Sequence, residues 1–341
     1  MQKEGARLKN KNNTCKLFVY NCKTNQEKGF FKKYAKQFEL EVGFTSEVPS
    51  IENVDLANGY DYINVMISHV SKEMLEKWNT MGIKMISTRT VGYDHFDVES
   101  AKEIGIHLGN SAYPPDAVAE YAIMLMLMTC RNVKLMLQKG SINDYTLGHL
   151  PTTNMREKKI GIIGTGKIGA GVVKKVKNLC KEVLMYDIVE NDEVTSYGTY
   201  CDLDTIFKTC DIISLHIPAF DETKHIVNAE RLAMMKSTAV IVNTARGDLI
   251  DTKALIKALQ EKTIAGAGLD VVEGETGIVF HDFSHDILSH EEMAILQNMP
   301  NVIFTPHAAY YTSTSMEYMI MNSLKTLILP KNKDENPWLI V

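Results

Sequence analysis

The stretch KIGIIGTGKIG at positions 159–169 determines the expected fold of this 341-residue chain. Its first five residues are mostly apolar, as in a buried strand of a parallel sheet, and Gly164, Gly166 and Gly169 follow them. In a strand–turn–helix unit, the first glycine permits a tight turn and the second lets the backbone approach a pyrophosphate. The third allows close packing of helix on strand. The free N–H groups at the start of that helix would then face the phosphates.

The residue after the next strand indicates which dinucleotide would bind. That strand is expected over 182–186, and Asp187 follows it about 20 residues beyond the glycines. A carboxylate at this point accepts hydrogen bonds from both ribose hydroxyls and repels a 2′-phosphate, so NAD is favoured over NADP. Ile188 and Val189 come next, rather than an arginine or a lysine. The alternative is a surface acid in an ordinary turn.

Strand-like and helix-like stretches alternate on both sides of this motif. Strands are expected at 16–20, 40–44, 62–67, 84–87, 182–186, 211–215, 238–242, 264–269 and 302–304. Helices are expected at 27–38, 71–81, 167–179, 252–260 and 313–329, with one long helix at 116–139 between the two series. The alternation predicts an α/β fold with two doubly wound parallel-sheet domains.

Composition excludes several other classes of protein. The net charge of −5 offers no basic face for nucleic acid or anionic lipid. The longest apolar run, 121–128, is far shorter than the roughly 20 residues that span a bilayer. Six cysteines without C-x-x-C spacing are expected to be reduced thiols in a cytoplasmic protein. Residues 1–14 are polar and basic, and are expected to form a disordered tail.

Charged residues follow three of the expected strands in the second series. Arg246 comes directly after a buried strand, where a guanidinium needs an anion and can grip a carboxylate with two hydrogen bonds. Gly247 beside it would leave room for a ligand. An internal salt bridge is the alternative. The next strand precedes a group of three acids, namely Asp270, Glu273 and Glu275.

His307 follows the last of these strands. A carboxylate partner would favour its imidazolium form, which suits a group that donates a proton at neutral pH and takes it back in the reverse reaction. A lone histidine is more often structural. Together with an anion clamp and an adjacent NADH, however, it supplies what the reduction of a 2-oxo acid requires. His281, His285 and His290 are irregularly spaced and are expected in a solvated loop, so no metal site is predicted.

The ordered set of motifs resembles the D-isomer-specific 2-hydroxyacid dehydrogenases from about Leu17 to Leu329. Within that family it is most similar to the D-lactate dehydrogenases, including the vancomycin-resistance type, and to the D-2-hydroxyisocaproate dehydrogenases. The motifs are RTVGYDHFD (89–97), NSAYPPDAVAE (110–120), the 164–169 loop, NTARG (243–247), LDVVEGE (269–275) and TPHAAYYT (305–312).

The resemblance implies roles for residues at these motifs. Arg246 would bind the substrate carboxylate, His307 would be the general acid/base, and Glu275 would pair with it. Asp270 would lie near the nicotinamide carboxamide. Further cofactor contacts would come from Lys167, Ile168, Ile217, Pro218, Thr223, Thr244 and Ala245. Further substrate contacts would come from Val91, Gly92, Tyr113 and Tyr310.

The resemblance also implies how the domains are arranged. A Rossmann NAD-binding domain at 112–311 would be inserted into a flavodoxin-like substrate domain formed by 15–111 and 312–341. The long helix after Pro115 would help to form a homodimer. The implied activity is reduction of pyruvate to D-lactate with NADH. The alternatives are a D-2-hydroxyisocaproate-type enzyme, a glyoxylate or hydroxypyruvate reductase, or an NAD(H)-sensing scaffold without catalysis.

Overall fold

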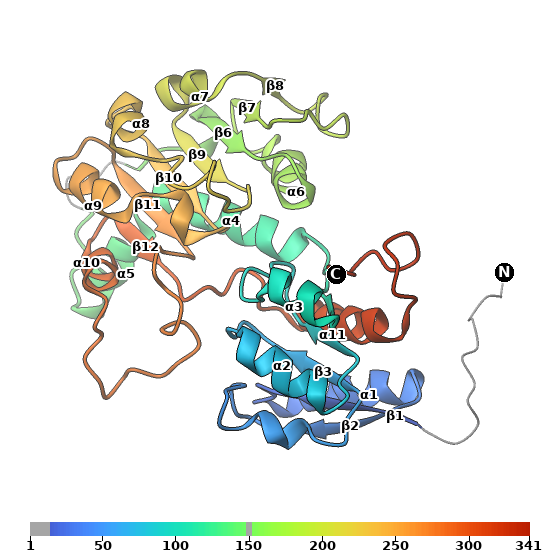
Figure 1. The fold of residues 1–341 in the computed structure, drawn as a ribbon. Helices are drawn as coiled ribbons and strands as arrows, with labels where there is room; N and C mark the ends of the chain where they lie inside the picture. Colours follow the sequence, from blue (N-terminus) through green and yellow to red (C-terminus); the bar gives the residue numbers. More distant parts are fainter. Residues whose placement is uncertain (1–13, 148–151) are drawn as a thin grey trace. The chain divides into compact units, whose positions relative to one another are not determined.

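The computed structural model describes residues 14–147 and 152–341. Internal contacts divide the chain into two compact units, one running to Pro114 and resuming at Thr312–Val341, the other formed by Pro115–Tyr311. The second unit therefore interrupts the first in the sequence (Figure 1). Of the predicted disordered tail, residues 1–13 lie outside the described part of the chain.

The first unit contains a five-stranded parallel sheet in the order β2-β1-β3-β4-β5, the doubly wound order of flavodoxin-like folds. The strands are β1 (Cys15–Val19), β2 (Leu40–Phe44), β3 (Tyr62–Val65), β4 (Met85–Thr88) and β5 (His107–Gly109). The helices are α1 (Asn25–Gln37), α2 (Lys72–Thr80), α3 (Val98–Ile104) and α11 (Ser313–Ile328), with the 3-10 turn η1 (Val54–Ala57).

The C-terminal helix completes the core of this unit. Ile320 and Leu324 of α11 are buried in one cluster with Leu17 of β1 and Phe31 of α1. These four side chains come from opposite ends of the sequence, so burying them requires the chain to return after the second unit. Thr24 fixes the start of α1 because its hydroxyl accepts from Glu27 N at 3.1 Å, in a reciprocal capping box.

The second unit contains a seven-stranded parallel sheet in the order β12-β11-β10-β9-β6-β7-β8. The strands are β6 (Lys159–Ile163), β7 (Glu182–Tyr186), β8 (Thr199–Tyr200), β9 (Ile212–Leu215), β10 (Val240–Asn243), β11 (Gly266–Leu269) and β12 (Val302–Phe304). The order reverses at β6, as in a Rossmann sheet, where ligands bind beyond the carboxyl ends of the strands. The predicted class, α/β with two doubly wound parallel sheets, is confirmed.

Helices cover both faces of this sheet in Figure 1. They are α4 (Asp116–Cys130), α5 (Val133–Ser141), α6 (Lys167–Val176), α7 (Leu203–Thr209), α8 (Ala229–Met234), α9 (Thr252–Gln260) and α10 (Glu291–Asn298), with the 3-10 turns η2 (Met155–Glu157) and η3 (Gly247–Leu249). Two hydrophobic clusters result, one on each side of the sheet.

The prediction of a single helix over 116–139 is wrong. The helix ends at Cys130, and α5 starts at Val133 after Asn132, whose φ of 49° lies in the left-handed region. An asparagine tolerates that conformation better than most side chains, and it ends an α-helix. The sequence does not reveal such a break, because apolar residues continue on both sides of it, as Met128 before it and Val133, Leu135 and Leu137 after it show.

Short elements were also missed by the sequence analysis. The periodicity did not predict β5, β8, α3, α7, α8 and α10, each of which has eight residues or fewer.

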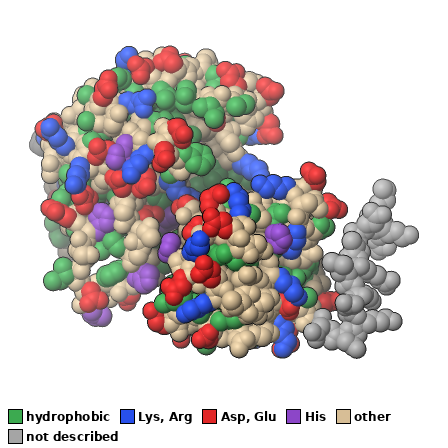
Figure 2. Space-filling view, viewed as in Figure 1, with side chains coloured by type: hydrophobic (Ala, Val, Ile, Leu, Met, Phe, Trp, Pro, Cys, Tyr) green, Lys and Arg blue, Asp and Glu red, His purple; other side chains and the backbone are tan. Residues whose placement is uncertain are grey.

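None of the helices within 14–147 and 152–341 combines the length and apolar character that crossing a bilayer requires. On the face shown in Figure 2, acidic and basic side chains are interspersed rather than gathered by sign.

Candidate active site

Three neighbouring strands of the second unit bring the predicted catalytic residues to one edge of the sheet. In the parallel register, Asn243 at the end of β10 lies opposite Leu269 of β11, and Leu269 lies opposite Phe304 of β12. Arg246, Glu275 and His307 come shortly after these three strand ends. Because the strands are parallel, the loops that follow them emerge at the same edge.

The side chains of His307 and Glu275 are in contact. Nδ1 of His307 lies 2.6 Å from Oε1 of Glu275, and the two side chains are only 19% and 16% exposed. The second carboxylate oxygen of Glu275 accepts from the main-chain N of Val272 at 3.0 Å. The acid is therefore anchored at one oxygen while the other orients the imidazole. A hydrogen bond at Nδ1 leaves Nε2 as the nitrogen that can exchange a proton with a ligand.

Asp270 holds the backbone of the loop that carries His307. Its carboxylate is 1% exposed and accepts from Thr305 Oγ1 (2.6 Å) and from the main-chain N of Ala308 and Ala309 (both 2.8 Å). Its own main-chain O accepts from His307 N at 2.8 Å. His307 has a φ of 54°, in the left-handed region, so these bonds stabilise a conformation that is otherwise unfavourable.

Arg246 stands on a loop that packs against the loop of Glu275. Asn243 closes the turn: its Nδ2 donates to Arg246 O at 2.8 Å, and its Oδ1 accepts from Ala245 N at 3.0 Å. A Cβ at Gly247 would lie 2.1 Å from the carbonyl carbon of Val272. The glycine was expected to leave room for a ligand. The structure instead shows that it lets two backbones approach, which places the Arg246 turn beside the 270–275 loop.

A second histidine–carboxylate pair was missed by the sequence analysis. Nε2 of His225 lies 2.7 Å from Oε1 of Glu273, and the main-chain N of His225 donates to Asp248 O at 2.8 Å. The loop after β9 is thereby tied to the loops after β10 and β11. The three acids of the 270–275 segment thus have separate structural partners: Asp270 binds the loop after β12, Glu273 binds His225, and Glu275 binds His307. No sequence spacing predicts the pairing of His225 with Glu273.

Aromatic rings surround His307 on the same unit. The ring centroids of Tyr310 and Phe280 lie 6.2 and 5.9 Å from that of His307, and Phe280 lies 6.4 Å from Tyr310. Tyr310 was predicted from the sequence. Phe280 was not, because it lies in an irregular loop with no periodic signal. The imidazole is therefore bordered by two aromatic rings as well as by the Glu275 carboxylate.

The glycine-rich loop has the predicted geometry. Gly164 has a φ of 96°, and a Cβ at Gly169 would lie 1.9 Å from Gly164 O, so helix and strand pack closely only without side chains there. Gly166 is the N-cap of α6, and a Cβ on it would meet no heavy atom within 4 Å. The space in front of Gly166 and of the exposed Lys167 is open, as a phosphate-binding loop requires.

Comparison with known proteins agrees with this geometry. Residues 123–309 match the model of the D-isomer specific 2-hydroxyacid dehydrogenase NAD-binding domain. A D-specific alpha-keto acid dehydrogenase of Enterococcus faecalis is 38% identical over 297 residues, covering 87% of this chain and 90% of the relative. An aromatic 2-oxoacid reductase of Clostridium sporogenes is 35% identical over 315 residues, covering 92% and 95%.

A solved D-lactate dehydrogenase from Treponema pallidum superposes with a TM-score of 0.83 at 31% identity, covering 91% of this chain and 95% of that one. The chain belongs to the D-isomer-specific 2-hydroxyacid dehydrogenase family. It is an NAD-dependent oxidoreductase that acts on CH–OH groups. The predictions of the family, the class of enzyme and the cofactor are confirmed.

The residues of this dehydrogenase fit NAD. Asp187 follows β7, and its Oδ2 accepts from Thr165 N in the glycine-rich loop at 2.6 Å. The hydroxyl of Thr244, a predicted cofactor contact, is buried and has no hydrogen-bond partner within the described chain. An unpaired buried hydroxyl is costly unless a ligand satisfies it. Together with the open space at Gly166, these groups suit a dinucleotide.

The remaining predicted residues divide between the two units. Ile168, Ile217, Pro218, Thr223 and Ala245 follow β6, β9 and β10 in the second unit of the dehydrogenase. Thr223 Oγ1 donates to Pro218 O at 2.8 Å and so shapes the loop after β9. Val91, Gly92 and Tyr113 belong to the first unit. There, the carbonyl oxygens of Val91 and Gly92 accept from Asn110 Nδ2 (2.7 Å) and Thr90 Oγ1 (2.6 Å).

Two observations concern other kinds of site. In the described ranges 14–147 and 152–341, no three His, Cys, Asp or Glu side chains gather as metal ligands would. His216 hydrogen-bonds Ser214 Oγ through Nε2 at 2.9 Å, and burial lowers the pKa of its ring to about 4. His216 is therefore neutral at neutral pH and is no candidate for the proton donor.

The Asp270 contacts predict a structural cost of removing this carboxylate. Asp270→Ala leaves three donors around His307 without their acceptor, which should lower the free energy of unfolding by roughly 2–4 kcal/mol. Urea denaturation measures this. Asp248→Ala, which removes an exposed acid from the neighbouring loop, is the control and should change stability by less than about 0.5 kcal/mol. Equal effects of the two variants would contradict the assigned role of Asp270.

Proposed function

We propose that the enzyme uses NADH to reduce a small 2-oxo acid to the D-2-hydroxy acid, with pyruvate and D-lactate as the first candidates. The observation that carries this proposal is the 2.6 Å contact between His307 Nδ1 and Glu275 Oε1. The loop of Glu275 packs against the Arg246 turn at Gly247, so the histidine–carboxylate pair and the arginine belong to neighbouring loops. An oriented imidazole and a guanidinium at one sheet edge are what a carboxylate-bearing carbonyl substrate requires. The similarity to a D-lactate dehydrogenase supports the choice of pyruvate.

His307 acts as the general acid in this proposal. With Nδ1 bonded to Glu275, the imidazolium donates its Nε2 proton to the keto oxygen of the substrate as that oxygen gains negative charge. The neutral ring that remains keeps its Nδ1 proton in the bond to Glu275. In the direction of oxidation, Nε2 takes the proton back from the hydroxyl group. When bound, NADH would supply the hydride that reaches the keto carbon.

Arg246 holds the substrate. Its guanidinium binds the carboxylate and stabilises the charge that develops on the keto oxygen. The Asn243 contacts and the close approach at Gly247 keep the backbone of the Arg246 turn rigid, so this backbone loses little freedom when substrate binds. Asp270 holds the loop of His307 in a fixed position beside the loop of Glu275.

The other binding residues keep the roles that the family resemblance implies. We assign cofactor binding to Gly164, Gly166, Lys167, Ile168, Gly169, Asp187, Ile217, Pro218, Thr223, Thr244, Ala245, Arg246 and Asp270. We assign substrate binding to Val91, Gly92, Tyr113 and Tyr310 beside Arg246 and His307. The domain of 15–111 and 312–341 would then bind substrate, and that of 112–311 the cofactor. A cytoplasmic location is part of the same proposal.

A second candidate is the reduction of aromatic 2-oxo acids. Phe280 and Tyr310 lie within ring-contact distance of His307, and they could stack on an aryl side chain. One relative, similar over 92% of this chain, is named as an aromatic 2-oxoacid reductase. The same rings would equally enclose the branched side chain of 2-oxoisocaproate, so the aromatic setting favours substrates larger than glyoxylate.

Removing either member of the histidine–carboxylate pair should abolish most of the turnover. We expect His307→Ala to lower kcat about 10²–10⁴-fold, because the proton donor is lost. Glu275→Gln should also lower kcat, because it removes the carboxylate oxygen that bonds Nδ1 and orients the ring. Stopped-flow kinetics and NADH titration separate turnover from cofactor binding, which should stay near that of the parent. His281→Ala, an exposed histidine on a nearby loop, is the control. Unchanged turnover of His307→Ala would contradict the mechanism.

A panel of 2-oxo acids identifies the substrate. NADH oxidation with pyruvate, 2-oxoisocaproate, phenylpyruvate, glyoxylate and hydroxypyruvate should give the highest kcat/KM for pyruvate, and at least about a tenfold lower value for glyoxylate, which lacks the methyl group. Chiral chromatography should show D-lactate as the product. A maximum with phenylpyruvate supports the second candidate. Tight NADH binding without any turnover would instead indicate the sensing scaffold and refute the proposal.

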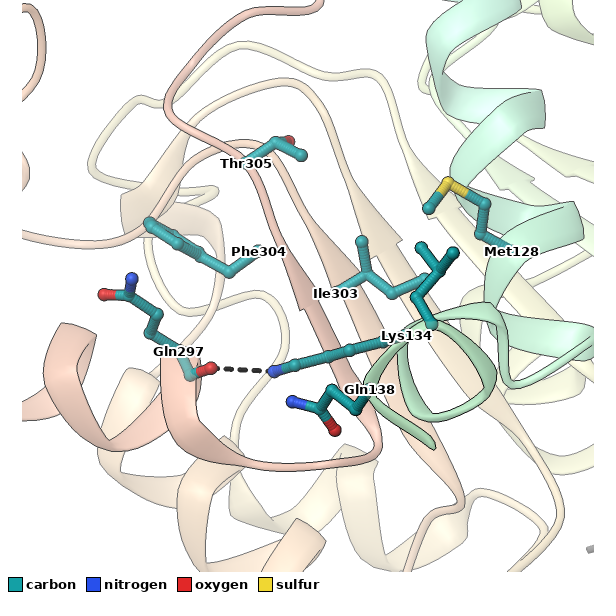
Figure 3. Close-up of a pocket in the computed structure, with 8 residues that line it drawn as sticks. Met128, Lys134, Gln138, Gln297, Ile303, Phe304 and Thr305 are labelled. Carbon is teal, nitrogen blue, oxygen red and sulfur yellow. Dashed lines mark hydrogen bonds between the residues drawn. The ribbon is translucent and has the colours of Figure 1, made fainter. Parts of the chain in front are cut away.

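We further propose that the enzyme is a homodimer formed through α4, α5 and the segment after α5. Large apolar side chains are exposed there: Met124, Leu127, Leu137, Ile142, Tyr145 and Leu147. A pocket of about 430 Å³ borders this surface, lined by Met128, Leu137 and Phe304, among others (Figure 3). Lys134 in that pocket donates to the carbonyl oxygens of Gln297, Met299 and Val302 and thereby joins α5 to the end of α10.

Sedimentation velocity tests this assembly. The parent should sediment as a dimer, and Leu137→Glu should shift it towards monomer, because a charge replaces an apolar side chain that is 67% exposed in one chain. Ile287→Glu, at an exposed apolar residue outside α4, α5 and the segment after α5, is the control and should stay dimeric. A monomeric parent at micromolar concentration would exclude the dimer.

A further inference from the structure

A directed chain of hydrogen bonds ends at the carboxylate of Asp187. The main-chain N of Asn191 donates to Tyr200 Oη at 2.8 Å, and Tyr200 Oη donates to Thr165 Oγ1 at 2.8 Å. Thr165 Oγ1 in turn donates to Asp187 Oδ2 at 3.2 Å. None of the motifs identified in the sequence includes Tyr200 or Asn191.

The direction of this chain is fixed at both ends. A main-chain N–H can only donate and a carboxylate oxygen can only accept, so each hydroxyl between them must donate towards Asp187. The main-chain N of Thr165 donates to the same oxygen, Oδ2, at 2.6 Å. The other oxygen, Oδ1, accepts from Ile188 N at 2.7 Å. The carboxylate is thus held at both oxygens.

Neighbouring strands bring these groups together. Tyr200 lies in β8 opposite Met185 of β7, while Thr165 follows β6 (Figure 1). Asn191 ties the connection between β7 and β8 to the glycine-rich loop, because its Nδ2 donates to Thr165 O at 2.8 Å. Thr165 is only 1% exposed. Water therefore cannot readily replace a hydrogen bond that is lost there.

We propose that Tyr200 and Thr165 are positioning residues for the dinucleotide, which orient the Asp187 carboxylate towards the ribose hydroxyls and so set the preference for NADH over NADPH. This inference rests on the proposed role of Asp187. A carboxylate already held in one orientation loses little side-chain entropy when ribose binds. A carboxylate free to turn aside would admit a 2′-phosphate, whereas a held one repels it, and such repulsion is how a site rejects the wrong ligand.

Removing one oxygen atom tests the proposal. Tyr200→Phe should raise the Kd of ADP-ribose and of NADH by about threefold to tenfold, the usual effect of one hydrogen bond. The Kd of NADPH should stay the same or fall, so that the two dinucleotides are distinguished less well. Titration calorimetry with ADP-ribose on the cofactor-free protein measures this independently of turnover. At saturating NADH, kcat should not change.

Matched variants separate positioning from packing. Tyr197 and Tyr200 pack against the same hydrophobic cluster, so Tyr197→Phe removes a hydroxyl from the same segment without breaking the chain. It should bind ADP-ribose as the parent does. Thr165→Val should weaken binding as Tyr200→Phe does, while Thr165→Ser keeps a hydroxyl and should restore most of the affinity. This second pair tests the proposal even if Tyr200→Phe is unstable.

The outcomes also distinguish two kinds of failure. If Asp187→Ala leaves the Kd of NADH unchanged, the proposed role of Asp187 is wrong. The positioning role of Tyr200 and Thr165 is then refuted as well. If Asp187→Ala weakens NADH binding but Tyr200→Phe and Tyr197→Phe do not differ, only the positioning role is refuted. Equal losses of NADH and NADPH affinity in both Tyr200→Phe and Thr165→Val would also overturn it.

Discussion

The main-chain hydrogen bonds that pair β10, β11 and β12 are the interaction on which the rest of the candidate active site depends. They hold Asn243, Leu269 and Phe304 side by side at the ends of three parallel strands. The loops that follow, which carry Arg246, Glu275 and His307, therefore start from the same edge of one rigid sheet. A catalytic site needs side chains fixed within a fraction of an ångström, and a buried sheet gives that precision more readily than free loops do.

Beyond the sheet edge, the loops support one another through contacts that leave little freedom. Gly247 allows backbone to approach backbone, and the buried Asp270 carboxylate accepts the N–H groups that follow His307. Glu273 and His225 connect the loop after β9 to the same group. The left-handed conformation of His307 costs free energy that these bonds offset. The strain therefore falls on the residue whose orientation the proposed proton transfer requires.

The proposed cofactor site follows the same principle at β6 and β7. Close approach at Gly164 and Gly169 sets the turn, and the Asp187 carboxylate is bound to the turn through Thr165. Family membership establishes NAD as the cofactor of this dehydrogenase. The structure adds how the acid after β7 is connected to the glycine-rich loop. Both halves thus use a carboxylate held by main-chain N–H groups to fix a neighbouring binding element.

The sequence by itself determined the α/β class, the glycine-rich loop with Asp187, and the presence of an arginine, an acid and a histidine after successive strands. These features depend on local periodicity and on motifs a few residues long, which the chain displays directly. The sequence did not reveal the break between α4 and α5, because apolar residues continue on both sides of Asn132. β8 was missed because it has only two residues, and α10 because it buries only Met293 and Leu296 and so shows a weak apolar pattern.

Only the tertiary structure decided which side chains meet. The pair His307–Glu275 was expected from the family resemblance alone, and the structure shows the contact. No local spacing relates His225 to Glu273, Phe280 to His307, or Asn191 and Tyr200 to Asp187. The 270–275 segment contains three acids for one histidine, and the structure pairs Glu275 with His307, as the family resemblance implies. Such contacts arise from strand order and loop packing, which depend on the whole sheet rather than on any one stretch of sequence.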